Sequence, residues 1–146
     1  MQKTVLVPID VSQMNDIFDP MLSVAKALAA ASNARIVLLN VIEELPGYVD
    51  IQLPSGIHEK AESDATAALK GIKSKWGLPE SAEILVRTGH PSRTILEVAE
   101  ALDSDVIVLA SHDPGLADYL LGSVAARVVR HAHCSVHVVR QARGER

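Results

Sequence analysis

Five short apolar runs, rich in β-branched residues, recur along the 146-residue chain. Runs of this length, bounded by polar or turn-forming residues, predict β-strands. They cover residues 4–9, 35–41, 83–87, 105–110 and 135–140. The first, second and fourth runs are almost wholly apolar, which is typical of central strands that helices cover on both faces.

Longer segments between these runs carry apolar residues at every third or fourth position, as amphipathic helices do. They predict helices over residues 20–32, 57–76, 92–102 and 123–132. Asp19 followed by Pro20 is a favourable N-cap and first-turn pair for the first helix. Strands that alternate with helices in this way predict an α/β fold with a mostly parallel open sheet and right-handed crossovers. Residues 42–56, which hold two prolines and two glycines, predict a long loop.

The composition fits one domain over residues 1–146. With 48% hydrophobic residues, the chain can bury a single core, and only the polar tail at 141–146 is expected to fray. A formal charge of −4 and four scattered aromatic residues argue against a nucleic-acid partner. No apolar run approaches the roughly 20 residues of a membrane span, and the N-terminus becomes polar too soon for a signal peptide. With a single cysteine, Cys134, these features predict a cytoplasmic protein.

Candidate chemistry is concentrated after the fourth predicted strand, in the stretch ASHDPGLADYLLGS at residues 110–123. A parallel strand would deliver this stretch to the carboxyl edge of the sheet, where ligands bind in open α/β folds. A hydrolase centre of Ser111, His112 and Asp113 is disfavoured, because three consecutive side chains diverge and no Gly-x-Ser-x-Gly elbow is present.

Gly122 and Ser123 lie at the start of the last predicted helix and leave two interpretations open. A glycine there lets an anion approach the backbone, and the serine hydroxyl and the first-turn N–H groups can donate to it. Alternatively, the pair only caps the helix. Asp10, at the end of the first strand, is likewise either a ligand contact or a cap of the next turn. Because neither Walker nor Rossmann spacing is present, these residues indicate an anion site without specifying its ligand.

Other reactive side chains are expected to be structural. His131, His133 and His137 face different directions in the predicted elements, so they do not predict a metal site. Cys134, just before the last strand, is expected to be a small core residue.

Several longer segments resemble a known family. These are VLVPID at 5–10 followed by Ser12, LLNVIEE at 38–44, Gly89-His90-Pro91, and the whole stretch 105–140. Together they resemble the universal stress protein family over nearly the whole chain. The segment LLGSVAARVVRHAHCSVHVVR is highly specific to that family.

This resemblance implies a five-stranded parallel sheet in the order 3-2-1-4-5 with helices on both faces. It also implies that ATP binds where the first and fourth strands meet. Carried over residue by residue, Asp10 would contact the ribose or the adenine side, Val41 would contact adenine, and the start of the last helix would hold the phosphates. The nucleotide-binding residues implied in this way are Pro8, Ile9, Asp10, Ser12, Val41, Leu109, Ala110, Ser111, His112, Gly122, Ser123 and Val124.

The phosphate loop departs from the family pattern of Gly, two residues, Gly, nine residues, then Gly followed by Ser or Thr. Ala110 and Asp113 replace the first two glycines, and eight residues separate Asp113 from Gly122. The Asp113 carboxylate would repel phosphate unless it turns away or a divalent cation such as Mg²⁺ intervenes. The shortened loop resembles that of a branch of small bacterial members that keeps nucleotide binding.

The family also implies a homodimer through the last predicted strand, from Ser135 to Arg140, whose apolar edge would otherwise stay open. We therefore expect a dimeric stress-response regulatory protein that binds ATP. We expect little or slow hydrolysis, because no convincing general base or Walker lysine is visible. The alternative is a nucleotide-free dimer that binds an unknown protein partner through the 42–56 loop or the dimer surface.

Overall fold

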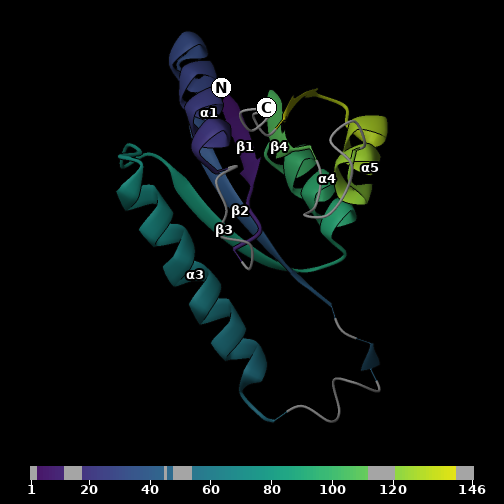
Figure 1. Cartoon of the computed structure of the whole chain (residues 1–146). Coiled ribbons are helices and arrows are strands. Elements are labelled where there is room, and N and C mark those ends of the chain that lie inside the picture. The colour runs from purple at the N-terminus through teal and green to yellow at the C-terminus, as the bar shows by residue number, and fades with distance from the viewer. Residues whose placement is uncertain (1–2, 12–17, 45, 48–53, 112–120, 141–146) are drawn as a thin grey trace, which may run out of the picture.

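The computed structural model describes residues 3–11, 18–44, 46–47, 54–111 and 121–140 of the chain. Within these ranges, strands and helices alternate as the sequence predicts (Figure 1). The strands are β1 (Thr4–Pro8), β2 (Arg35–Glu43), β3 (Glu83–Gly89), β4 (Val106–Ala110) and β5 (Ser135–Val139). The helices are α1 (Phe18–Ser32), α3 (Ile57–Lys75), α4 (Pro91–Ala101) and α5 (Ser123–His131).

The strands form one parallel sheet in the order β3-β2-β1-β4-β5, which confirms the predicted fold class and topology. β1 lies in the middle, where Val5 pairs with Ile36 of β2 and with Val106 of β4. The strand order therefore reverses between β1 and β4, and the carboxyl ends of all the strands lie along one edge. In open α/β sheets, ligands bind at such a switch point.

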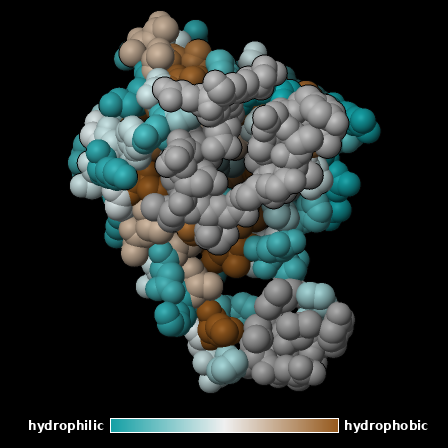
Figure 2. All heavy atoms as spheres, viewed as in Figure 1, coloured by the Kyte–Doolittle hydropathy of each residue, from teal (hydrophilic) through white to brown (hydrophobic). Residues whose placement is uncertain are grey.

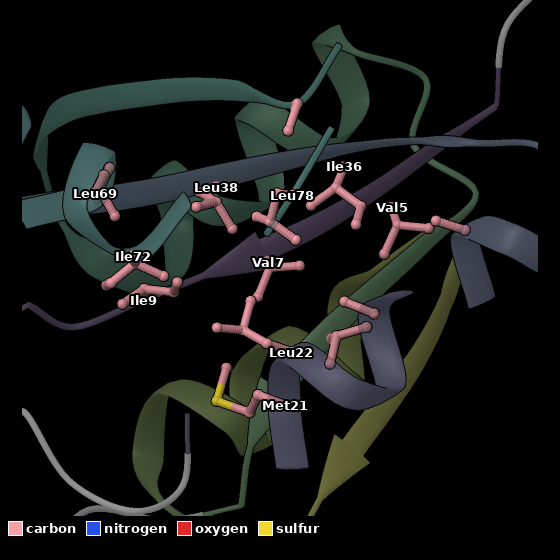
Figure 3. Packing of buried hydrophobic residues seen from close by; sticks show 14 of the residues in the cluster. Val5, Val7, Ile9, Met21, Leu22, Ile36, Leu38, Leu69, Ile72 and Leu78 are labelled. Carbon is pink, nitrogen blue, oxygen red and sulfur yellow. The ribbon is translucent and has the colours of Figure 1, made fainter. Parts of the chain in front are cut away.

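Helices cover both faces of the sheet: α1 and α3 pack on one face, and α4 and α5 pack on the other (Figure 1). Successive residues of β1 enter different cores, since Val5 and Val7 face α1 and α3, whereas Leu6 faces α4 and α5. Figure 3 shows the first core, in which Val7, Leu22 and Leu78 gather. The unbroken apolar run of β1 follows from this arrangement, because both of its faces are buried.

The element boundaries differ from the sequence prediction by one or two residues, and two of these differences change a prediction. β2 continues through Ile42 and Glu43, because these residues pair with the last two residues of β3. The predicted 42–56 loop is therefore wrong at its start, and part of its remainder lies outside the described residues. α1 begins at Phe18, so Asp19 lies in the first turn of the helix and is not its N-cap.

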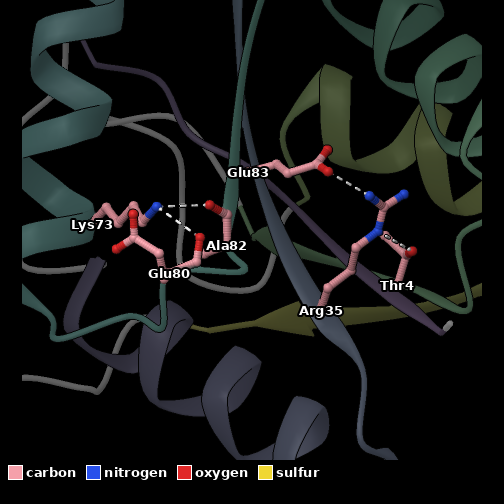
Figure 4. Close-up of polar contacts among 6 residues, drawn as sticks. All are labelled: Thr4, Arg35, Lys73, Glu80, Ala82 and Glu83. Atoms are coloured by element: carbon pink, nitrogen blue, oxygen red, sulfur yellow. Dashed lines mark hydrogen bonds and ion pairs between the residues drawn. The ribbon is translucent and has the colours of Figure 1, made fainter.

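Polar contacts hold together the amino edge of the sheet, opposite the switch point (Figure 4). Arg35 of β2 donates to Oε1 of Glu83 in β3 at 2.7 Å and to Oγ1 of Thr4 in β1 at 3.1 Å. The backbone N–H of Thr4 donates to Oδ2 of Asp105, just before β4, at 2.7 Å. Lys73 of α3 donates to two backbone carbonyls ahead of β3, at 3.3 and 2.9 Å. Structural contacts therefore occupy the amino edge, whereas the carboxyl edge carries the candidate chemistry.

Few large hydrophobic residues are exposed in the described part of the chain. On the face seen in Figure 2, hydrophobic residues form only small separate areas among the residues that are coloured. Ile57 and Val129 are the large hydrophobic residues that are exposed in the described ranges. No helix within those ranges is long and apolar enough to span a bilayer.

Gly89, the last residue of β3, sets how closely α4 approaches the sheet. A Cβ atom at this position would lie 2.6 Å from Oγ1 of the buried Thr94. We therefore expect Gly89→Ala to lower the free energy of unfolding by about 1–3 kcal/mol. The matched control is Gly71→Ala in α3, where a Cβ atom meets nothing within 4 Å. This control should raise stability by about 0.5–1 kcal/mol, and equal effects in chemical denaturation would contradict the packing assigned to Gly89.

Candidate functional site

Hydrogen bonds to β2 fix the backbone that follows β1 at the switch point. Pro8 ends the strand, where the missing N–H of a proline is tolerated. The N–H of Ile9 donates to the carbonyl of Leu39 at 2.7 Å, and Nδ2 of Asn40 donates to the carbonyl of Ile9 at 2.8 Å. Asp10 follows and is exposed. An anchored backbone thus carries this carboxylate to the carboxyl edge of the sheet.

Asn40 is the site residue that sequence reasoning missed. Its side chain is buried, with 5% of the residue exposed, and a buried amide requires a hydrogen-bond partner. The signal that could have found it is a single amide inside the apolar stretch LLNV at 38–41. Such a residue in a central strand indicates that a backbone group nearby lacks its regular ladder partner.

Ser111 joins the end of β4 to its neighbours. The residue is 2% exposed. Its N–H donates to the carbonyl of Val139 in β5 at 3.0 Å, and its carbonyl accepts from the N–H of Gly122 at 2.8 Å. Ser111 therefore holds the start of α5 against the end of β4, although residues 112–120 between them lie outside the described part of the chain.

The start of α5 differs in detail from the sequence interpretation. Gly122 is the N-cap, with φ −64° and ψ 161°, and no side chain caps the helix. Ser123 is the first helical residue and is exposed, so the expectation that its hydroxyl caps the helix is wrong. Because the N–H of Gly122 is bonded to Ser111, the donors that the helix leaves unpaired are those of its first turn, Ser123 to Ala125. That turn contains no acidic residue, so its charge favours an anion.

The predicted site residues come from four elements that end or begin at one edge. β1 supplies Pro8 with Ile9 and Asp10 after it, β2 supplies Val41, β4 supplies Leu109 and Ala110 with Ser111 after it, and α5 supplies Ser123 and Val124 after Gly122. The side chains of Ile9 and Leu109 are buried in the two cores, so only their backbone atoms can face a ligand. Ala110, Val41 and Val124 are half-buried. Ser12 and His112 lie outside the described residues.

The remaining candidates are placed away from this edge or do not converge. Cys134 is half-buried and packs against the core beneath α4 and α5, as expected for a small core residue. Burial raises the pKa of its thiol, a backbone hydrogen bond opposes the shift, and the Asp105 carboxylate adds to it. The thiol is therefore protonated at neutral pH and is a poor nucleophile. Across the described ranges, no three His, Cys, Asp or Glu side chains gather as metal ligands would.

Comparison with known proteins identifies the family of this chain. A sequence model of the universal stress protein family matches residues 1–140. Universal stress protein G of Salmonella typhimurium is 31% identical over 147 aligned positions, which cover 96% of this chain and 100% of the relative.

Solved structures agree over the same length. Protein MJ0577 superposes with a TM-score of 0.80 at 25% identity, and the match covers 99% of each chain. A universal stress protein in complex with cAMP superposes with a TM-score of 0.65 at 25% identity, over 95% of this chain and 97% of the other. The sequence match along residues 1–140, and a 31% identical relative that the match covers over its whole length, show that the chain belongs to the universal stress protein family.

Proposed function

We propose that this protein binds ATP at the carboxyl edge of its sheet and acts as a regulator in the stress response, with little or slow hydrolysis. One observation carries the proposal. The strand order reverses between β1 and β4, and at this same edge α5 begins with N–H groups that no bond within the helix satisfies and with no acidic residue in its first turn. A position that favours ligand binding thus coincides with a helix start that favours an anion.

Each part of a nucleotide has a candidate partner at this edge. The phosphates would accept hydrogen bonds from the N–H groups of Ser123, Val124 and Ala125. Asp10 would contact the ribose or the adenine side, and the half-buried Val41 would provide an apolar contact for adenine. A family member of 25% identity that holds cAMP supports a nucleotide as the class of ligand. ATP, alone or with Mg²⁺, is the more specific proposal.

The conformation of Gly122 also supports a close ligand. Its φ of −64° and ψ of 161° are open to any residue, so backbone strain does not explain a glycine here. Space does: without a side chain, the N-cap lets a phosphate reach the first turn of α5. Among the described site residues there is no lysine to hold the outer phosphates, so hydrolysis should be slow.

One observation favours the alternative, a nucleotide-free interaction module. The N–H of Gly122 already donates to the carbonyl of Ser111, and both residues are buried. If this backbone bond closes the start of α5, no phosphate can bind there. Nucleotide titration separates the two functions.

We further propose that the protein forms a homodimer through β5. β5 is the last strand in the sheet order and pairs with β4 on one side. The carbonyl of Val139 points toward β4, where it accepts from Ser111, and backbone groups alternate in direction along a strand. The N–H and carbonyl of Val138 therefore point to the outer edge, where a second copy of β5 could add to the sheet.

Gly122→Val tests the phosphate site. Valine can adopt the observed φ and ψ, and its side chain would fill the space proposed for phosphate. We expect the affinity for ATP to fall by more than about 100-fold, because two or more charge-assisted hydrogen bonds of about 1.5–3 kcal/mol each are lost. Titration calorimetry measures the loss, and circular dichroism with size-exclusion chromatography checks the fold. A folded variant that binds ATP as the wild type does would show that the phosphates are misplaced.

Val138→Pro tests the dimer. The substitution removes an N–H that faces the outer edge, so β4–β5 pairing should remain while the dimer dissociates. His137→Pro is the matched control. The N–H of residue 137 points toward β4, so its removal should lower the stability of the fold itself. Light scattering after size-exclusion chromatography should give a dimer for the wild type and a folded monomer for Val138→Pro. A monomeric wild type, or a variant that stays dimeric, would rule out this interface.

A further inference from the structure

A groove of about 830 Å³ runs between α4 and α5 and begins beside the proposed phosphate site. The two helices lie next to each other on one face of the sheet (Figure 1). Both follow a parallel strand, so both begin at the carboxyl edge. At this end the groove is lined by Ser92 and Arg93 from the first turn of α4 and by Ser123 and Arg127 from α5.

Positive charge is concentrated at this end of the groove. Neither α4 nor α5 has an acidic residue in its first turn, and the positive ends of both helix dipoles point the same way. Arg93 and Arg127 are exposed, and neither takes part in an ion pair within the described part of the chain. The acidic residues that line the groove begin one turn further on, with Glu97 and Glu100 in α4 and Asp103 after its end.

The spacing on α5 brings its arginine to the proposed ligand. Ser123 and Arg127 are four residues apart, and both line the groove, so they share one face of the helix. Long helical side chains lean toward the helix N-terminus, which directs the Arg127 guanidinium toward the mouth of the groove. A cation so close to a helix N-terminus is unfavourable with respect to the helix dipole unless an anion lies beside it. The chain supplies no such anion in the first turn of either helix.

We propose that Arg127 and Arg93 bind the terminal phosphates of the nucleotide and make the site selective for a triphosphate over a monophosphate. This inference rests on the proposed nucleotide site and adds a reason why that site would prefer a nucleotide with three phosphates. The first phosphate meets the N–H groups of α5, which any nucleotide can use. A chain of further phosphates extends into the mouth of the groove between the two guanidinium groups, which bind phosphate as charged, two-pronged donors. A monophosphate is too short to meet them.

The test compares AMP, ADP and ATP by titration calorimetry on the full chain, with Arg127→Gln, Arg93→Gln and the double variant. Wild type should bind ATP more tightly than AMP. Each single substitution should weaken ATP about 10-fold or more, the loss of one charge-assisted contact, and should leave AMP unchanged. Arg130→Gln is the matched control, because Arg130 lines the same groove one turn further along α5.

A second readout separates direct contact from a structural role. The affinity for ATP should depend less steeply on salt concentration in Arg127→Gln than in wild type, because one charged contact has been removed. Equal losses for AMP and ATP, or equal effects of Arg127→Gln and Arg130→Gln, would overturn the inference while leaving the nucleotide site intact. A wild type that binds none of the three nucleotides would overturn the nucleotide site as well.

Discussion

Parallel pairing of β1 on both of its sides is the constraint on which the rest of the structure depends. Its residues enter two cores in alternation, so β1 can be satisfied only in the middle of the sheet, between β2 and β4. The chain then builds outward in one direction through β2 and β3, and in the other through β4 and β5. Right-handed crossovers place α1 and α3 on one face and α4 and α5 on the other. The segments that follow β1 and β4 run to opposite faces of the sheet. The candidate site lies between these two segments at the carboxyl edge.

Ser111 connects the two parts of the molecule to which we assign function. Its carbonyl holds the N-cap of α5, and its N–H holds Val139 at the end of β5. The proposed phosphate site and the proposed dimer edge are thus supported by one buried residue. A ligand that shifts the start of α5 would act directly on the strand through which a second copy would bind. Such a link gives a regulatory role a physical route that needs no hydrolysis.

Much of the fold could be predicted from the sequence, because it depends on local pattern. The apolar runs and the three-to-four-residue repeats identify the strands and helices, and the all-apolar character of three runs identifies the central strands. Boundaries set by pairing at a distance could not be read in this way: Ile42 and Glu43 continue β2 because β3 lies beside them. The segment there has turn-forming composition, and tertiary pairing overrides it.

The candidate site was predictable in its residues more than in its contacts. Asp10 and Gly122 stand out by position, but the partner of Asn40 is a carbonyl 31 residues away in sequence, and only the folded sheet brings the two together. The same holds for Ser123, which sequence favoured as a cap. The N–H of Gly122 donates to the carbonyl of Ser111, Gly122 is the N-cap, and Ser123 lies in the first turn of the helix, where its side chain does not cap it. In both cases the deciding hydrogen bond joins residues that are separated in sequence.

The most direct test of the account is to identify what the protein carries when it is purified without added nucleotide. The protein is denatured, and the small molecules that it releases are analysed by mass spectrometry. We expect ATP or ADP in amounts comparable to the protein, and none from Gly122→Val purified in the same way. Release of no nucleotide, together with no binding when ATP is added, would contradict it and would leave partner binding as the function of this fold.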